Sequence, residues 1–226
     1  DTNVIAGSDG DQFKVHTTQQ LSLGQEMHFQ DGRRFRYSKA GAVAVVVAKF
    51  YQGAIPVTGT SAVIAPAAAA AVGDRSVSMA IVTNTVAADE FRDGYLVVQL
   101  ASNTGFGYIY QVGPHAAAAA STTLVVPLRS PVQVAIATTA ASALLIANPN
   151  SGVILAIATT PTAALAGVSQ GPIPIGQYGW LLVSGITTCL AVGTVVIGTT
   201  VMIASTTGGV MPQTTAVSLT VPGVGI

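Results

Sequence analysis

The chain has 226 residues, with nine basic and nine acidic side chains and therefore no formal net charge. Such a chain is not expected to bind nucleic acid or an anionic membrane, because both partners select for an excess of Lys and Arg. Charged residues make up only 8% of the chain, whereas ordinary soluble domains carry about 25%. Half of the residues are hydrophobic but few are aromatic. Small and β-branched residues of this kind favour closely packed β-sheets and offer few groups for catalysis.

The charged residues are confined to the first 129 positions, and residues 130–226 contain no Asp, Glu, Lys, Arg or His. A free molecule with so much neutral surface is prone to associate. We therefore expect this half of the chain to be covered in an assembly; the alternative is a neutral surface kept soluble by Thr and Ser hydroxyls. The same change in composition predicts an N-terminal arm (1–20), a charge-bearing β-subdomain (21–129) and an uncharged β-subdomain (130–226), unless the last two form one continuous domain.

The first predicted strands, residues 21–29 and 34–37, flank the turn sequence Asp31-Gly32. Apolar residues on both sides of an Asp-Gly pair are a strong hairpin signal. Because side chains alternate along a strand, Arg34 and Arg36 should share one face and the aromatic residues between them the other.

Short strands separated by Gly, Pro, Asn and Asp are predicted along the rest of the chain. Residues 40–52 read as a connector and a strand, and residues 56–72 as a loop with at most one helical turn after Pro66. Further strands are expected at 76–85, 95–100, 106–112, 123–126, 132–137, 143–147, 153–158, 178–184, 187–192, 194–197, 201–204 and 216–221. Many short strands at regular spacing predict an all-β sandwich or barrel, mostly antiparallel and with little helix.

Residues 179–204 are uncharged and long enough to span a bilayer. However, glycines divide the segment into short pieces rich in β-branched residues, and no Lys or Arg flanks it, as an oriented spanning helix would require. The segment is therefore predicted to form strands and not a membrane span. No basic segment followed by an apolar run opens the chain, so no signal peptide is expected.

Residue types that carry catalysis or bind metals are few and scattered. His16, His28 and His115 lack metal-binding spacing, and the acidic residues at 89–93 are interpreted as a solvated turn and not as a cation site. The single cysteine, Cys189, lies in an apolar stretch far from any His or acid and is interpreted as a buried hydrophobic residue. We expect no enzyme activity, no cofactor and no metal.

The basic residues are concentrated at one place, in Arg33, Arg34, Arg36 and Lys39. Interleaved aromatic residues would suit single-stranded nucleic acid. The same pattern describes an amphipathic strand with its aromatic residues in the core and its arginines outside. We favour the amphipathic strand and expect these four side chains to contact an acidic surface of a partner.

Four segments carry a resemblance to a known class: GRRFRYSKAGAVAVVVAKFYQ, DGYLVVQLASNTGFGYIYQVG, ANPNSGVILAIATT and GQYGWLLVSGITTCLAVGTVVIGTTVMIASTTGGV. They resemble structural proteins of the tailed-bacteriophage head, and above all the small β-rich capsid decoration (cement) proteins. The resemblance implies a β-barrel or sandwich, often a homotrimer, that binds the major capsid protein on the outer surface of the virion. It implies no catalytic residues, and this chain is long enough to add a second β-subdomain.

Two other classes compete with this interpretation. Another phage component is one, but a major capsid protein would show a long charged helix and a fibre would show short repeats, and neither pattern is present. An enzyme or carbohydrate-binding β-domain is the other. Such modules usually present exposed aromatic residues, whereas the single tryptophan, Trp180, lies inside an apolar run.

Overall fold

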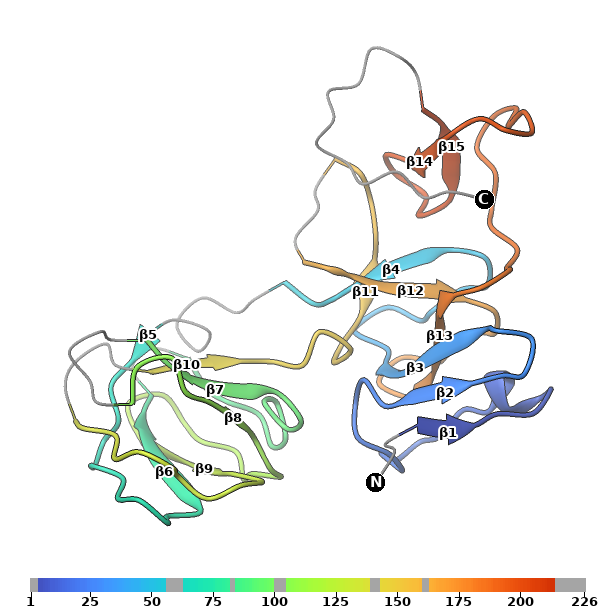
Figure 1. Cartoon of the computed structure of the whole chain (residues 1–226). Coiled ribbons are helices and arrows are strands. Elements are labelled where there is room, and N and C mark those ends of the chain that lie inside the picture. Colours follow the sequence, from blue (N-terminus) through green and yellow to red (C-terminus); the bar gives the residue numbers. More distant parts are fainter. Residues whose placement is uncertain are drawn as a thin grey trace. The chain divides into compact units, whose positions relative to one another are not determined.

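The computed structural model (Figure 1) describes residues 4–55, 63–81, 84–99, 105–138, 143–159 and 163–213. Within these ranges the chain forms 15 strands and one short 3-10 helix, η1 (Asp11–Phe13). Among the described strands, only β1 and β2 pair in parallel. The predicted all-β class, with many short antiparallel strands and little helix, is confirmed.

The chain divides into two compact units that do not follow the change in charge along the sequence. Unit 1 combines Asp1–Ile55 with Pro149–Ile226, and unit 2 is the intervening Pro56–Asn148. The boundary predicted after residue 129 is not a boundary of these units, because residues 130–148 complete unit 2 and the rest of the uncharged half supplies strands to unit 1. Strand pairing, and not composition, decides which segments pack together.

Unit 1 is built on a seven-stranded sheet with the order β1-β2-β3-β13-β12-β4-β11. Its strands are β1 (Val4–Ala6), β2 (Glu26–His28), β3 (Arg34–Lys39), β4 (Phe50–Gln52), β11 (Ile154–Leu155), β12 (Leu165–Ser169) and β13 (Tyr178–Ser184). A separate two-stranded sheet is formed by β14 (Val201–Ile203) and β15 (Val210–Pro212). It packs on Phe50 and Val168 of the larger sheet through Val201, Ile203 and Val210.

The predicted Asp-Gly hairpin is present between β2 and β3. Gly32 has a φ of 89°, a left-handed conformation that glycine adopts without strain, and the Phe29 N–H donates to the Arg33 carbonyl at 2.9 Å. The predicted alternation on β3 is also correct. Phe35 and Tyr37 are fully buried, whereas Arg34 and Arg36 are exposed on the opposite face.

Tyr37 lies at the centre of an aromatic group in the core of unit 1. Its ring stacks on Tyr178 and meets the edge of Trp180, with centroids 5.9 and 5.1 Å away. Its hydroxyl lies 3.1 Å from Nδ1 of His16, whose backbone pairs with β13 at Tyr178. Thus residues 4–20, predicted to be part of an extended arm, are integrated into the unit through β1, η1 and the bridge at His16.

Unit 2 has two sheets that enclose one core. The larger sheet has the order β5-β10-β7-β8 and the smaller pairs β6 with β9. Their strands are β5 (Val63–Ile64), β6 (Ser76–Ala80), β7 (Tyr95–Val98), β8 (Ile109–Gln111), β9 (Thr123–Pro127) and β10 (Ala143–Ile146). Leu96, Tyr110 and Leu145 of the larger sheet share a core with Met79 and Leu124 of the smaller sheet, which makes unit 2 a small sandwich.

Several predicted elements differ from the observed ones. No strand forms at 187–192 or 194–197, where only Ala191 makes an isolated bridge, and 132–137 holds only a bridge at Ile136. The strands β1, β5, β12 and β15 were not predicted from the sequence. The alanines after Pro66 form bridges and turns, not helix, and the strand expected at 216–221 lies outside the described residues.

The segment 179–204, which is long enough to span a membrane, contains most of β13 and all of β14. In the described part of the chain, no helix is long and apolar enough to cross a membrane.

The two points at which unit 1 is interrupted by unit 2 lie side by side. A Cβ added to Gly53 would lie 3.0 Å from the Pro149 carbonyl oxygen, and one added to Gly152 would lie 3.7 Å from Cβ of Ala54. The adjacent strands β4 and β11 are paired, with Gln52 of β4 opposite Ile154 of β11. Unit 2 is therefore an insertion at a single place in unit 1.

Candidate functional site

The four basic residues predicted to contact a partner lie on β3 and the turn before it, and their side chains differ in what they bind within the chain. Arg33 holds the turn together. Its Nε donates to Oδ2 of Asp31 at 2.5 Å, its Nη2 donates to Oδ1 of Asp9 at 2.8 Å, and its guanidinium lies 4.7 Å over the ring of Phe29. The backbone N–H of Arg33 also donates to Asp31 and is the main cause of the lowered pKa of that carboxyl group. Arg33 is therefore engaged within unit 1.

Arg36 is also paired within unit 1. Its Nε and Nη2 both donate to Oε1 of Glu26, at 3.1 and 2.9 Å, while Nε2 of His28 lies 2.9 Å from the other carboxylate oxygen. The pair forms because the hairpin register places Glu26 opposite Arg36. The hydrogen bond with His28, and then the one with Arg36, lower the pKa of Glu26, against a smaller opposing effect of burial.

The lowered pKa of Glu26 predicts a dependence of stability on pH. Because the folded state binds a proton less readily than the unfolded state, Glu26 stabilises unit 1 above its ordinary pKa of 4.5, and this contribution is lost as the pH falls through the lower, folded value. Replacing Glu26 by Gln should lower the free energy of unfolding at pH 7 by about 0.5 kcal/mol, the size usual for a partly exposed pair. The difference from the native chain should shrink as the pH falls below 4.5.

Urea denaturation between pH 3 and 7, followed by Trp180 fluorescence, measures this difference in unit 1. The control is Glu90→Gln in unit 2, where the carboxylate accepts a hydrogen bond from the Ala87 N–H. That substitution should leave the Trp180 transition unchanged at every pH. A stability difference for Glu26→Gln that persisted undiminished at pH 3 would contradict the assignment.

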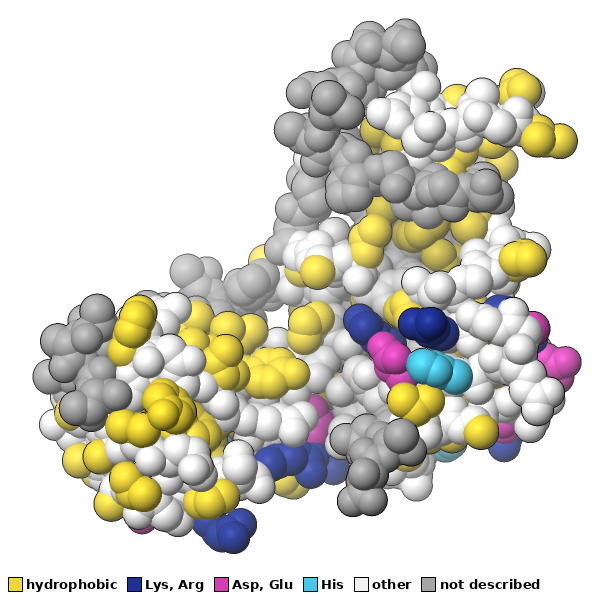
Figure 2. Space-filling model, viewed as in Figure 1, with side chains coloured by type: hydrophobic (Ala, Val, Ile, Leu, Met, Phe, Trp, Pro, Cys, Tyr) yellow, Lys and Arg dark blue, Asp and Glu magenta, His cyan; other side chains and the backbone are white. Residues whose placement is uncertain are grey.

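Arg34 and Lys39 are the better candidates for contact with a partner, because neither makes an ion pair with the residues that the structure describes. Lys39 lies with its ammonium group 5.6 Å from the ring centroid of Tyr178. Arg34 projects from the same face of β3 as Arg36, beside β13, to which it pairs at Ser184. Figure 2 shows basic, acidic and histidine side chains grouped over the region of β2 and β3, with hydrophobic side chains close by.

A groove of about 930 Å³ crosses this face of unit 1. One end is lined by Glu26, Arg34 and Arg36. The remainder is lined mainly by aliphatic and small side chains of β12, β13, β14, β15 and the loop after β13, among them Leu165, Val168, Val183, Ile186, Val195, Val201 and Val210. Because the strand order is β2-β3-β13-β12, the groove passes from a charged end to an apolar one. Sequence reasoning found the charged end and missed the groove, whose walls come from segments far apart in the chain.

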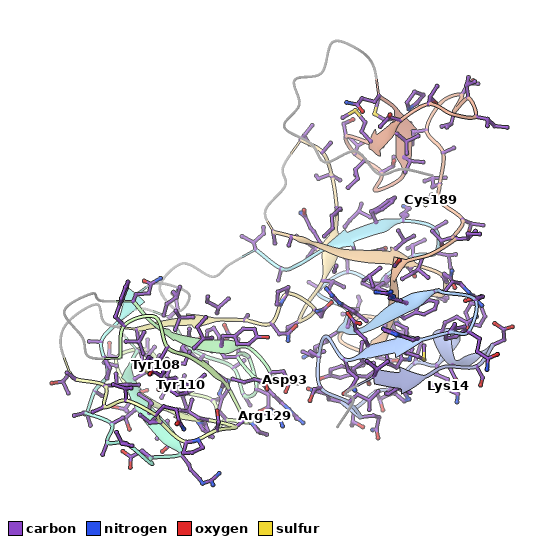
Figure 3. All side chains as sticks on the ribbon, in the orientation of Figure 1. Lys14, Asp93, Tyr108, Tyr110, Arg129 and Cys189 are labelled. Atoms are coloured by element: carbon purple, nitrogen blue, oxygen red, sulfur yellow. The ribbon has the colours of Figure 1, made fainter. Side chains whose placement is uncertain are left out.

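Cys189 is half-buried and lines this groove (Figure 3). Its side chain packs against the cluster formed by Phe50 and β14. Burial raises the pKa of the thiol, which disfavours the nucleophilic thiolate. Over the described residues, no three His, Cys, Asp or Glu side chains lie close enough together to hold a metal ion. The aliphatic lining of the groove therefore suits it to binding an apolar surface.

His115 in unit 2 has a structural role. Its Nε2 accepts a hydrogen bond from the Phe91 N–H at 2.9 Å, and its Nδ1 lies 2.9 Å from the Ala116 carbonyl oxygen, so the proton sits on Nδ1. The backbone N–H of His115 donates to Asp89 at 2.9 Å. Both ring nitrogens are thus engaged by the backbone, and the ring holds the 88–94 turn against the loop that follows β8.

Not all of the acidic residues at 89–93 are solvated, contrary to the prediction from the sequence. Asp93 is completely buried, and its Oδ1 accepts a hydrogen bond from Nη2 of Arg129 at 2.5 Å, while its carbonyl oxygen accepts one from the Asn148 side chain at 2.9 Å (Figure 3). The buried charge is compensated by Arg129, whose side chain is 41% exposed. This pair joins the turn before β7 to the end of β9 and stabilises unit 2.

No protein-family model matches the chain, and no curated protein or solved structure is significantly similar to it. The resemblance to phage head proteins therefore stays a prediction from the sequence.

Proposed function

We propose that this chain is a non-enzymatic virion protein that decorates and stabilises a bacteriophage capsid. In this role it binds across subunits of the major capsid protein on the outer surface of the head and associates with copies of itself, as a trimer. The resemblance of four sequence segments to phage decoration proteins suggests the role. One structural observation supports it most directly, namely the amount of aliphatic surface that the uncharged half leaves exposed.

That surface is concentrated between β13 and β14. Within residues 186–197, five large aliphatic side chains are substantially exposed: Ile186 (90%), Leu190 (40%), Val192 (37%), Val196 (61%) and Ile197 (102%). A single exposed aliphatic residue on a soluble protein is ordinary, but a cluster of this density marks an interaction surface. With no Asp, Glu, Lys, Arg or His in the segment, binding must come from burial of apolar area and from hydrogen bonds of Thr hydroxyls and backbone groups.

Binding of this kind suits a capsid surface. Each contact of a decoration protein with one capsid subunit can be weak, because simultaneous contact with several subunits raises the overall affinity by roughly two to four orders of magnitude. Arg34, which lines the charged end of the groove, would add contacts to acidic groups of the shell beside the apolar surface, and Lys39 would do so at the other end of β3; neither makes an ion pair within the described residues. Stabilisation of the shell then follows from linkage, because a ligand that binds only the assembled form favours that form.

Co-sedimentation with phage heads assembled without this protein tests the proposal. The native chain should pellet with such heads and raise the temperature at which they disrupt, whereas heads that already carry the protein should bind no more of it. The mass of the free chain in solution should exceed that of one copy. A chain that is a stable monomer and stays in the supernatant would overturn the proposal.

A further inference from the structure

Residues 196–199 form a tight turn that presents two aliphatic side chains to solvent. The Thr199 N–H donates to the Val196 carbonyl oxygen at 3.1 Å, the Thr199 hydroxyl donates to the same oxygen at 2.6 Å, and Gly198 has a φ of 83°. A turn with a left-handed glycine at its third position is well defined. Ile197, at its second position, is fully exposed. We call residues 196–199 the apolar turn.

The groove of unit 1 offers walls of the same chemistry. Away from Glu26, Arg34 and Arg36 it is lined by neutral and largely aliphatic side chains, and its volume of about 930 Å³ easily accommodates two such side chains. The apolar turn does not fill the groove of its own chain, because Ile197 retains its full exposure although nearby Val195 lines the groove wall. Only another molecule can bring such a turn into the groove.

We infer that the apolar turn of one copy inserts into the apolar end of the groove of a second copy. A second copy is the occupant that the charges favour, because the turn and, apart from Phe50, the wall at the apolar end of the groove come from the uncharged half of the chain, so that no charge is buried. Each copy carries one turn and one groove. The contact is thus between two different surfaces, and such head-to-tail contacts close into rings when the rotation allows it. The inference deepens the proposed function and rests on it for the expectation that copies associate.

Substitution at the tip of the turn tests the contact. In sedimentation velocity experiments, Ile197→Asp should raise the dissociation constant of self-association at least about tenfold, because a carboxylate would have to enter an apolar groove. The control is Val125→Asp on β9 of unit 2, which places the same charge at another exposed aliphatic residue. The control should associate like the native chain, and far-UV circular dichroism, which reports both units, should show both variants to be folded.

The native cysteine in the groove wall provides a direct test of the geometry. Under a mild oxidant, Ile197→Cys should give a disulfide between two copies, from position 197 of one to Cys189 of the other, visible as a dimer on a non-reducing gel. The double variant I197C/C189A should give no such band. Absence of the band in I197C, or its persistence in the double variant, which would mean that two turns meet each other, overturns the inference.

Failure of the inference is separable from failure of the proposed function. If Ile197→Asp associates and co-sediments with phage heads as the native chain does, the turn is not the contact and the decoration role stands. If the native chain associates through Ile197 but ignores heads, the contact stands and the decoration role fails.

Discussion

Replacing Gly94 by alanine is expected to destabilise unit 2 by about 4 kcal/mol while unit 1 stays folded. A Cβ at this position would lie 2.2 Å from the Ile146 carbonyl oxygen and 2.9 Å from that of Phe91. Neither backbone oxygen can move aside easily. Ile146 is paired with Tyr95 in the ladder between β10 and β7, and the Phe91 oxygen accepts the hydrogen bond that closes the 88–94 turn. A clash with backbone belongs to the few mechanisms that give destabilisation of this size.

The single tryptophan makes the two units separately observable. Trp180 lies in unit 1, so its fluorescence in urea should be unchanged by Gly94→Ala, while hydrogen exchange in β7 and β10 should become faster. Gly107→Ala is the control: Gly107 has a φ of 84° with open space around it, so alanine there should cost only about 1 kcal/mol. Equal stability of the two variants would contradict the steric explanation.

The second large effect is expected at Tyr37 in unit 1. Tyr37→Ala removes a fully buried ring that contacts Tyr178 and Trp180, and should lower the free energy of unfolding by about 3–5 kcal/mol. Tyr37→Phe keeps the ring and loses the hydroxyl that lies beside Nδ1 of His16 and accepts from the Gln20 N–H, which should cost about 1 kcal/mol.

Both Tyr37 variants are read by urea denaturation with Trp180 fluorescence, and Tyr37→Ala should also shift the native emission to longer wavelength. Tyr108→Ala in unit 2 is the matched control. Tyr108 is exposed, so the Trp180 transition should not move. A loss of less than about 1 kcal/mol for Tyr37→Ala would show that the aromatic group does not hold unit 1 together.

The local patterns in the sequence predicted the strands that alternate or carry a turn signal. The pattern RFRY and the Asp31-Gly32 turn led to β3 and its hairpin, and the run at 178–184 matches β13. β12 was missed because its sequence, LAGVS, has small residues and a glycine, and it forms only because β4 and β13 pair with it. The reverse holds at 187–197, where a β-branched run forms only a single bridge, from Ala191 to Val210 of β15, and most of its large aliphatic side chains stay exposed.

Long-range pairing also explains what was missed at the candidate site. The Glu26–Arg36 ion pair follows from a hairpin register that the turn sequence predicts, so the pair could have been predicted from the sequence. The buried pair of Asp93 with Arg129, 36 residues apart, depends on the bridge between Val112 and Leu128, which follow β8 and β9, and has no local signal. The groove likewise depends on β2, β12 and β14 coming together, which no local pattern specifies.

The adjacency of Gly53 and Pro149 has a consequence for how such a molecule can diversify. A gene that lost the codons for residues 56–148 would need only a tight turn to rejoin β4 to β11. By the same geometry, recombination near the codons for Gly53 and Pro149 would exchange one inserted sandwich for another, while the aromatic group around Tyr37 stayed intact. Unit 1 can therefore accept a different inserted domain at this position, by evolution or by protein engineering.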